Sequence, residues 1–129
     1  MSFTLGNRSR KNLEGVHPKL VAIVERAIVL TTVDFAVIEG VRSWAKQKEN
    51  VERGVSWTMS SRHLTQIDGY GHAVDLAAWV DGSIAWAPWS LYETIYQAMF
   101  AAAKELDTPI VWGGHWKQRD GVHFELKAL

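Results

Sequence analysis

Apolar residues spaced three and four positions apart predict two helices that each bury one face. The first helix begins at Pro18, a residue favoured in the first turn of a helix. Its apolar face consists of Leu20, Ile23, Val24, Ala27 and Ile28. The second helix covers residues 90–106, with an apolar stripe of Leu91, Ile95, Ala98, Met99, Ala102 and Leu106. A third, polar helix is predicted from Ser43, which can cap it, to about Arg53, where Gly54 ends it.

Short apolar runs between these helices predict strands. The strands are expected at residues 35–38, 72–79, 83–86, 109–112 and 122–126. Asp81-Gly82 is a hairpin turn signal between the second and third of these runs, and residues 55–70 have the composition of a long loop. No linker rich in Pro, Gly or Ser divides the sequence. The pattern therefore predicts one small α+β domain over residues 1–129, with helices packed on an antiparallel sheet.

The composition is that of a soluble globular protein. Hydrophobic residues make up 47% of the 129 residues and charged residues 22%, and fourteen basic residues balance fourteen acidic ones. This balance gives no reason to expect nucleic acid or a membrane surface as a partner. Residues 1–13 lack the apolar run of a signal peptide, and the apolar run at 20–30 is too short to span a membrane. We therefore expect a soluble chain made in the cytoplasm.

The absence of cysteine restricts any metal site to His, Asp and Glu ligands. His17 stands apart from other candidate residues and is expected to be an ordinary surface or core histidine. The remaining histidines and the carboxylates near them in sequence are His63, His72, His115, His123, Asp75, Asp120 and Glu125. A catalytic zinc site would take three of these ligands and leave one position open. Seven Trp residues are either core anchors or platforms in a binding groove.

Strand geometry narrows the choice among these residues. Alternation along residues 72–79 turns His72 and Asp75 to opposite faces, so they should not bind one metal ion. His123 and Glu125 share a face, and Asp120 precedes them by a turn and can reach the same side. On pattern alone, both a metal site and a set of solvated loop histidines with surface carboxylates remain open.

Four short motifs add a resemblance that covers essentially the whole chain. In order they are Gly40-Val41-Arg42-Ser43, Ser61-Arg62-His63, Gly71-His72-Ala73-Val74-Asp75-Leu76 and Asp120-Gly121-Val122-His123. Together they resemble the M15 family of zinc peptidases, with its G-x-R-S/T, S-x-H, G-x-A-x-D and D/E-x-x-H elements. Within that family the chain is most similar to the phage L-alanyl-D-glutamate endopeptidases, or endolysins. The resemblance implies an α+β peptidase fold shared with D-Ala-D-Ala peptidases and the hedgehog N-terminal domain.

The resemblance also implies roles for particular residues. His63, Asp75 and His123 would hold zinc, and Asp120 would be the general base. Arg42 would donate hydrogen bonds to the oxyanion of the transition state. The alternative for Arg42 is an ion pair at the start of a helix.

Three further residues are expected around this site. Ser61 would contact substrate or support the site from behind, and His115 would contact substrate. Glu125 would orient His123 or another group of the site from behind. The alternatives are an exposed turn residue for His115 and an ordinary surface carboxylate for Glu125.

One departure from the family pattern lies between two expected ligands. Seven residues separate His63 from Gly71, where the family usually has two, and we assign Gln66-Ile67-Asp68-Gly69-Tyr70 as an insertion. Such an extension costs little loop entropy. It is either a lid over bound substrate, with Asp68 available to a cation or an amine, or a passive surface loop.

The function implied is that of a zinc-dependent peptidase that cuts the stem peptide of bacterial peptidoglycan at the L-Ala–D-Glu bond. As an endolysin it would be a monomer that waits in the host cytoplasm and reaches the periplasm after a holin-type pore opens the membrane. The alternatives are a D-Ala-D-Ala carboxypeptidase or dipeptidase of the same family, and a non-catalytic module that binds the cell wall through its Trp residues.

Overall fold

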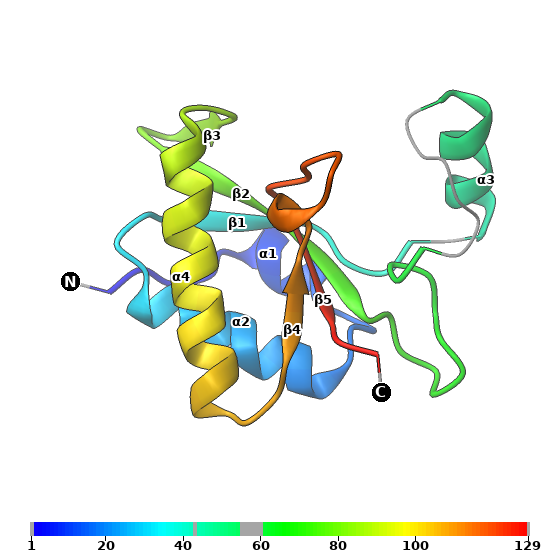
Figure 1. The fold of residues 1–129 in the computed structure, drawn as a ribbon, viewed down its shortest axis with the longest axis horizontal. Helices are drawn as coiled ribbons and strands as arrows, with labels where there is room; N and C mark the ends of the chain where they lie inside the picture. Colours follow the sequence, from blue (N-terminus) through cyan, green and yellow to red (C-terminus); the bar gives the residue numbers. More distant parts are fainter. Residues whose placement is uncertain (1, 43, 55–60, 129) are drawn as a thin grey trace.

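The fold is an antiparallel sheet with helices packed on it, seen in a computed structural model that describes residues 2–42, 44–54 and 61–128 (Figure 1). The helices are α1 (Asn7–Asn12), α2 (Pro18–Leu30), α3 (Trp44–Glu52) and α4 (Trp89–Glu105), with a 3₁₀ turn η1 (Gly113–His115). The strands are β1 (Phe35–Glu39), β2 (Ala73–Val80), β3 (Ser83–Ala85), β4 (Ile110–Trp112) and β5 (His123–Leu126). The predicted α+β class is confirmed.

Strand β2 organises the sheet, whose order is β1-β2-β5-β4 with β3 also paired to β2. Along one edge, β2 pairs with β5 at its start and with β3 at its end, and along the other edge it pairs with β1. All of these pairs are antiparallel. Asp75, near the start of β2, therefore lies between β1 and β5, inside the sheet.

A single hydrophobic cluster joins α2 and α4 to one face of this sheet. The buried strand residues in it are Phe35, Val37, Val74, Leu76, Ala78, Trp112, Phe124 and Leu126. The predicted apolar face of α2 is buried as expected, and so is that of α4 except for Leu91 and Leu106, which stay partly or largely exposed. The alternation along β2 leaves Asp75 on the other face of the sheet, away from the helices.

Helix α1 was not predicted, because its sequence NRSRKN has no apolar periodicity. It is held instead by polar contacts with β1. The Ser9 hydroxyl accepts a hydrogen bond from Val37 N at 2.9 Å, and Asn12 Nδ2 donates to Val37 O at 2.8 Å. The proposed cap Ser43, and residues 55–60 of the predicted loop, lie outside the described residues.

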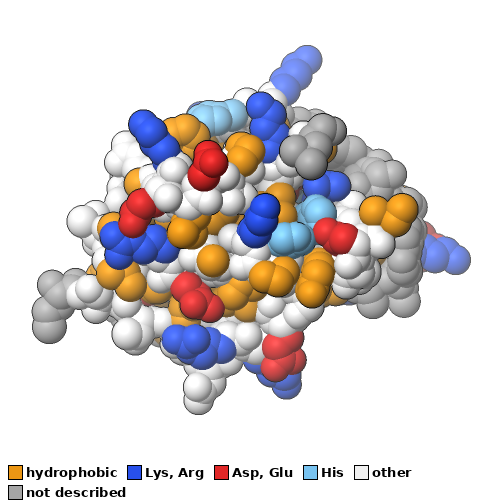
Figure 2. Space-filling view, turned by 90° about the horizontal axis from the view of Figure 1, so that it is seen from below, with side chains coloured by type: hydrophobic (Ala, Val, Ile, Leu, Met, Phe, Trp, Pro, Cys, Tyr) orange, Lys and Arg blue, Asp and Glu red, His pale blue; other side chains and the backbone are white. Residues whose placement is uncertain are grey.

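Charged side chains of both signs lie on the surface of the described residues. On the face in Figure 2, basic and acidic side chains of the described residues are interspersed. In the described segments no helix is both long and apolar enough to cross a membrane.

Candidate metal centre

Two of the three predicted ligands are neighbours across paired strands. Asp75 of β2 lies opposite His123 of β5 in the strand register, and paired residues of this kind have Cβ atoms about 5 Å apart. His123 Nδ1 lies 3.4 Å from Asp75 Oδ1. On its other edge β2 meets Glu39, where the register of β1 shifts.

The third ligand, His63, comes from the loop before β2 and is fixed by backbone contacts. Its backbone N donates to the Ser61 hydroxyl at 3.2 Å, and its backbone O accepts from Arg42 N at 2.8 Å. Its Nδ1 lies 2.9 Å from Gly40 O. The backbone of Gly40 also lies close to Asn12 O. A Cβ at position 40 would be 1.9 Å from this oxygen, so only glycine allows the two backbones to come this close.

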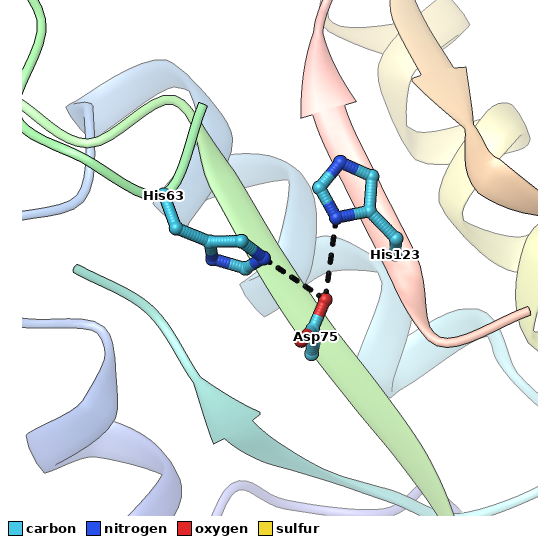
Figure 3. A group of neighbouring side chains, drawn as sticks. All are labelled: His63, Asp75 and His123. Atoms are coloured by element: carbon cyan, nitrogen blue, oxygen red, sulfur yellow. Dashed lines mark hydrogen bonds and ion pairs between the residues drawn. The ribbon is translucent and has the colours of Figure 1, made fainter. Parts of the chain in front are cut away.

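The three side chains converge on one point, as Figure 3 shows. His63 Nε2 lies 3.1 Å from Asp75 Oδ1, the same oxygen that faces His123. One ligand atom from each residue lies within 4.8 Å of the others, and all three side chains are largely buried. The group is therefore able to hold a metal ion.

The hydrogen bonds behind the two imidazoles fit this use. A carbonyl oxygen only accepts, so His63 Nδ1 donates to Gly40 O and leaves Nε2 free to bind a metal ion. On His123, Nε2 donates to Glu125 Oε1 at 2.8 Å and leaves Nδ1 directed at the centre. Glu125 thus contacts the imidazole nitrogen of His123 that does not face Asp75.

The ionisation of the centre favours a cation. Burial alone would raise the pKa of Asp75, but His123 and His63 hold this pKa well below its usual range. Burial alone would lower the pKa of His123, but Asp75 and Glu125 raise it to about 9 in the metal-free protein. A metal ion at this point would take the place of the His123 proton.

Asp120 borders the centre from the turn before β5. Burial raises the pKa of its carboxyl group, and the charge of Asp75 raises it further, against the opposing effects of His123, His63 and Arg42. Its backbone N donates to Gly113 O at 2.9 Å. A Cβ on Gly113 would lie 2.5 Å from Asp120 O, so a glycine is required there for Asp120 to hold its position.

Arg42 is a charged and mostly buried neighbour of the same centre, with its side chain 11% exposed. Burial alone would lower its pKa, but the Glu39 carboxylate, with Asp75 and Asp120, raises it. Nε of Arg42 donates to Glu39, which the sequence did not single out. The ion pair considered as an alternative for Arg42 therefore exists, but with β1, and it holds the guanidinium near the metal centre.

The side chains of His115 and Trp116, which follow β4, contact different parts of the molecule. His115 packs edge-on against Tyr96 and Trp112, with ring centroids 4.9 and 5.0 Å away. Trp116 instead lies against His123, at a centroid distance of 5.0 Å, and 37% of it is exposed. Trp116 thus lies beside the centre, and the sequence did not single it out because nothing in its local pattern distinguishes it from the other Trp residues.

His72 points away from the centre, as strand alternation required. Its Nε2 lies 2.7 Å from Asp68 Oδ2, and its ring meets the ring of His17 at 5.3 Å. His17 also contacts Tyr70 and lies 3.8 Å from Asp68. His17 is therefore not isolated: it contacts His72 and, from residues 66–70, Asp68 and Tyr70.

The comparisons with known proteins agree with this geometry. Residues 1–128 match the family model described as phage L-alanyl-D-glutamate peptidase. The chain belongs to this family. The L-alanyl-D-glutamate peptidase of Escherichia phage T5 is 32% identical over 130 residues, covering 98% of this chain and 91% of the phage protein. The crystal structure of the Serratia marcescens L-Ala D-Glu endopeptidase ChiX is similar with a TM-score of 0.85 and 45% identity, covering 94% of this chain and 87% of ChiX.

Family membership confirms the resemblance that the four motifs indicated. The similarity to ChiX spans 94% of this chain, so the two proteins share the fold described above.

Proposed function

We propose that the protein is a zinc-dependent peptidase that hydrolyses the L-Ala–D-Glu bond in the stem peptide of bacterial peptidoglycan. The observation that carries this proposal is the convergence of His63, Asp75 and His123, each imidazole oriented by a hydrogen bond on its far nitrogen. The bond is chosen from the names of the relatives, which are L-alanyl-D-glutamate peptidases.

Zinc is the metal that this donor set fits best. Two imidazole nitrogens and one carboxylate oxygen make three protein ligands, the number found in catalytic zinc sites that keep one position open. Softer ions would favour thiolate ligands, and the chain has no cysteine. When bound, zinc supplies Lewis-acid chemistry, which polarises a carbonyl group and acidifies a water molecule.

Asp120 acts as the general base and then as the general acid. It lies at the edge of the centre, where burial and the neighbouring Asp75 raise its pKa and so increase its affinity for a proton. Asp120 accepts the proton of the attacking water and returns it to the leaving amine of D-Glu.

Arg42 stabilises the negative charge that develops on the scissile carbonyl oxygen. Glu39 holds the guanidinium from behind, and the raised pKa keeps it charged throughout the reaction. A fixed cation near a developing oxyanion lowers the barrier without reorganisation during the step.

Trp116, Ser61 and His115 define the surroundings of the reacting peptide. Trp116 supplies a partly exposed aromatic surface beside His123, suited to contact with the substrate. Ser61 primarily shapes the turn that holds His63, and we keep a substrate contact for its hydroxyl as part of the proposal. For His115, whose ring packs on Trp112, we propose contact with more distant parts of the substrate.

In its biological setting the protein acts as an endolysin, as a monomer with one peptidase domain. It accumulates in the host cytoplasm and reaches the wall in the periplasm after a separate holin-type pore opens the inner membrane. The relative from Escherichia phage T5 supports this phage role.

The test is to digest purified peptidoglycan and synthetic stem peptides with the zinc-loaded protein and identify the new ends. We expect new D-Glu amino ends and L-Ala carboxyl ends. Release of free D-Ala would identify a carboxypeptidase instead. Binding to the wall without any new ends, in protein shown to contain zinc, would contradict the peptidase proposal and favour a wall-binding module.

A further inference from the structure

Arg62 lies directly before the ligand His63 but points to the opposite side, toward the back of the metal centre. Its Nη1 donates to Gln66 Oε1 at 3.0 Å, and its Nη2 lies 2.9 Å from His72 Nδ1 and 3.5 Å from Leu126 O. Its Nε is buried without a hydrogen bond and lies 3.8 Å from Glu125 Oε2. One guanidinium group thus contacts the inserted turn, β5 and the residue just before β2.

The protonation of His72 follows from these contacts. Arginine has no acceptor, so His72 Nδ1 must accept the hydrogen bond from Nη2 and carry no proton. The proton of a neutral His72 is then on Nε2, which donates to Asp68 Oδ2 at 2.7 Å. Asp68 of the inserted turn therefore fixes the His72 tautomer that Arg62 requires.

Glu125 lies between this cation and a metal ligand. Its Oε1 accepts from His123 Nε2 at 2.8 Å, while its Oε2 faces Arg62. The carboxylate is mostly buried, with its side chain 17% exposed. A carboxylate in such a place costs desolvation energy unless cations compensate it, and Arg62 is a cation beside it.

We propose that Arg62 is a positioning residue for the metal centre, which acts through Glu125 on His123. Arg62 holds Glu125 in the place where it accepts from His123 Nε2, and this directs His123 Nδ1 at the metal. The inserted residues 66–70 hold Arg62 in place in two ways. Gln66 accepts a hydrogen bond from Arg62, and Asp68 binds His72, which accepts from Arg62. This inference rests on the proposed role of His123 as a zinc ligand.

The planar shape of the guanidinium is part of the argument. Its three nitrogens face three partners: Nη1 faces Gln66, Nη2 faces His72 and Nε faces Glu125. A lysine ammonium on a flexible stem cannot reproduce this arrangement. Arg62→Lys should therefore keep the charge next to Glu125 but lose most of the positioning effect.

The test is a double-mutant cycle in zinc affinity, measured by competition with a chelator for the parent, Arg62→Met, Glu125→Gln and the double variant. We expect each single change to weaken zinc binding by about 10- to 100-fold, the usual effect of losing a partner of a metal-bound histidine. The double variant should bind zinc about as weakly as the weaker single variant, because both changes interrupt one chain of contacts.

Arg26→Met is the matched control, since Arg26 of α2 also donates to a carboxylate, that of Glu105, but on the surface. The zinc affinity of Arg26→Met should equal that of the parent.

A second readout covers the case in which Arg62→Met does not fold, as judged by circular dichroism. In the zinc-loaded protein the His123 Nε2 proton should give a protected NMR signal, and exchange of this proton with water should be faster in Arg62→Lys than in the parent or in Arg26→Lys. Unchanged zinc affinity and unchanged exchange in the Arg62 variants, or fully additive effects in the cycle, would overturn the inference. Failure of the parent to bind zinc at all would instead overturn the proposed function.

Discussion

At the scale of single residues, the two imidazoles of the metal centre present different nitrogens to it. His63 uses Nε2 and donates from Nδ1 to a backbone carbonyl, whereas His123 uses Nδ1 and donates from Nε2 to a carboxylate. A carboxylate partner makes an imidazole more basic than a carbonyl does. Asp75 and Glu125 together raise the pKa of His123 to about 9, and the orientation of its ring depends on the Glu125 side chain.

Removal of any of the three ligands should abolish stoichiometric zinc binding. His63→Ala, Asp75→Ala and His123→Ala each leave two protein ligands out of three. His72→Ala is the matched control and should keep one zinc ion per chain, because its ring points away toward Asp68. Elemental analysis of the purified proteins measures this. A zinc-free His72→Ala beside a zinc-replete His63→Ala would refute the ligand assignment.

Asp120→Asn should keep zinc and fold but lose most of the turnover. An amide cannot accept the proton of water, and general-base catalysis contributes on the order of 10²- to 10⁴-fold. The measurement is kcat on a stem peptide at matched zinc content, with Asp107→Asn, in the turn after α4, as the control. Near-normal kcat in zinc-loaded Asp120→Asn would assign the base to another carboxylate.

The metal-free protein should lose stability as the pH rises from about 6.5 to about 9. The pKa of His123 is higher in the folded state, about 9, than its ordinary value of 6.5, so its protonation stabilises the fold fully below 6.5 and no longer above 9. This contribution is about 3 kcal/mol. Urea unfolding at several pH values, with a chelator present, measures it. The same series on His123→Gln should lack the decline, and a parent that is equally stable at pH 6.5 and 9 would contradict the assignment.

At the scale of elements, the centre depends on the register of β2 and β5 and on two segments outside the sheet. The strands place Asp75 opposite His123, which strand alternation in the sequence allowed but could not fix. The loop before β2 supplies His63, and the turn after η1 supplies Trp116 and Asp120. The inserted residues 66–70 form a closed turn, in which Gln66 N donates to Tyr70 O at 2.8 Å.

Deletion of residues 66–70 should weaken zinc binding, by less than Arg62→Met. Gln66 and Asp68 are both part of the contacts that hold Arg62. Arg62 would keep its contact with Leu126 O. Zinc affinity and kcat of the deletion variant measure this. Slower turnover at unchanged zinc affinity would favour the lid instead, and no change in either would leave the turn a passive extension.

At the scale of the whole molecule, the proposed lysis role makes access to the wall the controlled step. Expression in a Gram-negative host should cause little lysis while the inner membrane is intact. Lysis should become rapid once chloroform or a holin-type protein permeabilises this membrane. The optical density of the culture measures this, with Asp120→Asn as the inactive control. Prompt lysis by the parent without permeabilisation would contradict the proposed route.

Much of this protein is determined by its sequence alone. The 3.6-residue spacing in α2 and α4 and the two-residue alternation in β2 and β5 are local patterns, and they gave the fold class and the opposite directions of His72 and Asp75. The order of the four motifs gave the family and the three candidate ligands. Both kinds of information lie in residue types and spacings, so they can be read without coordinates.

The contacts that support the centre were decided only by the tertiary structure. The polar helix α1 is held by β1, Arg62 lies beside Glu125, and Trp116 rather than His115 meets His123. These contacts join residues from different elements, and their geometry depends on the directions of individual side chains once the elements are packed. No spacing along the chain encodes such directions, which is why the sequence indicated the three candidate ligands and Glu125 but not Arg62, Glu39 or Trp116.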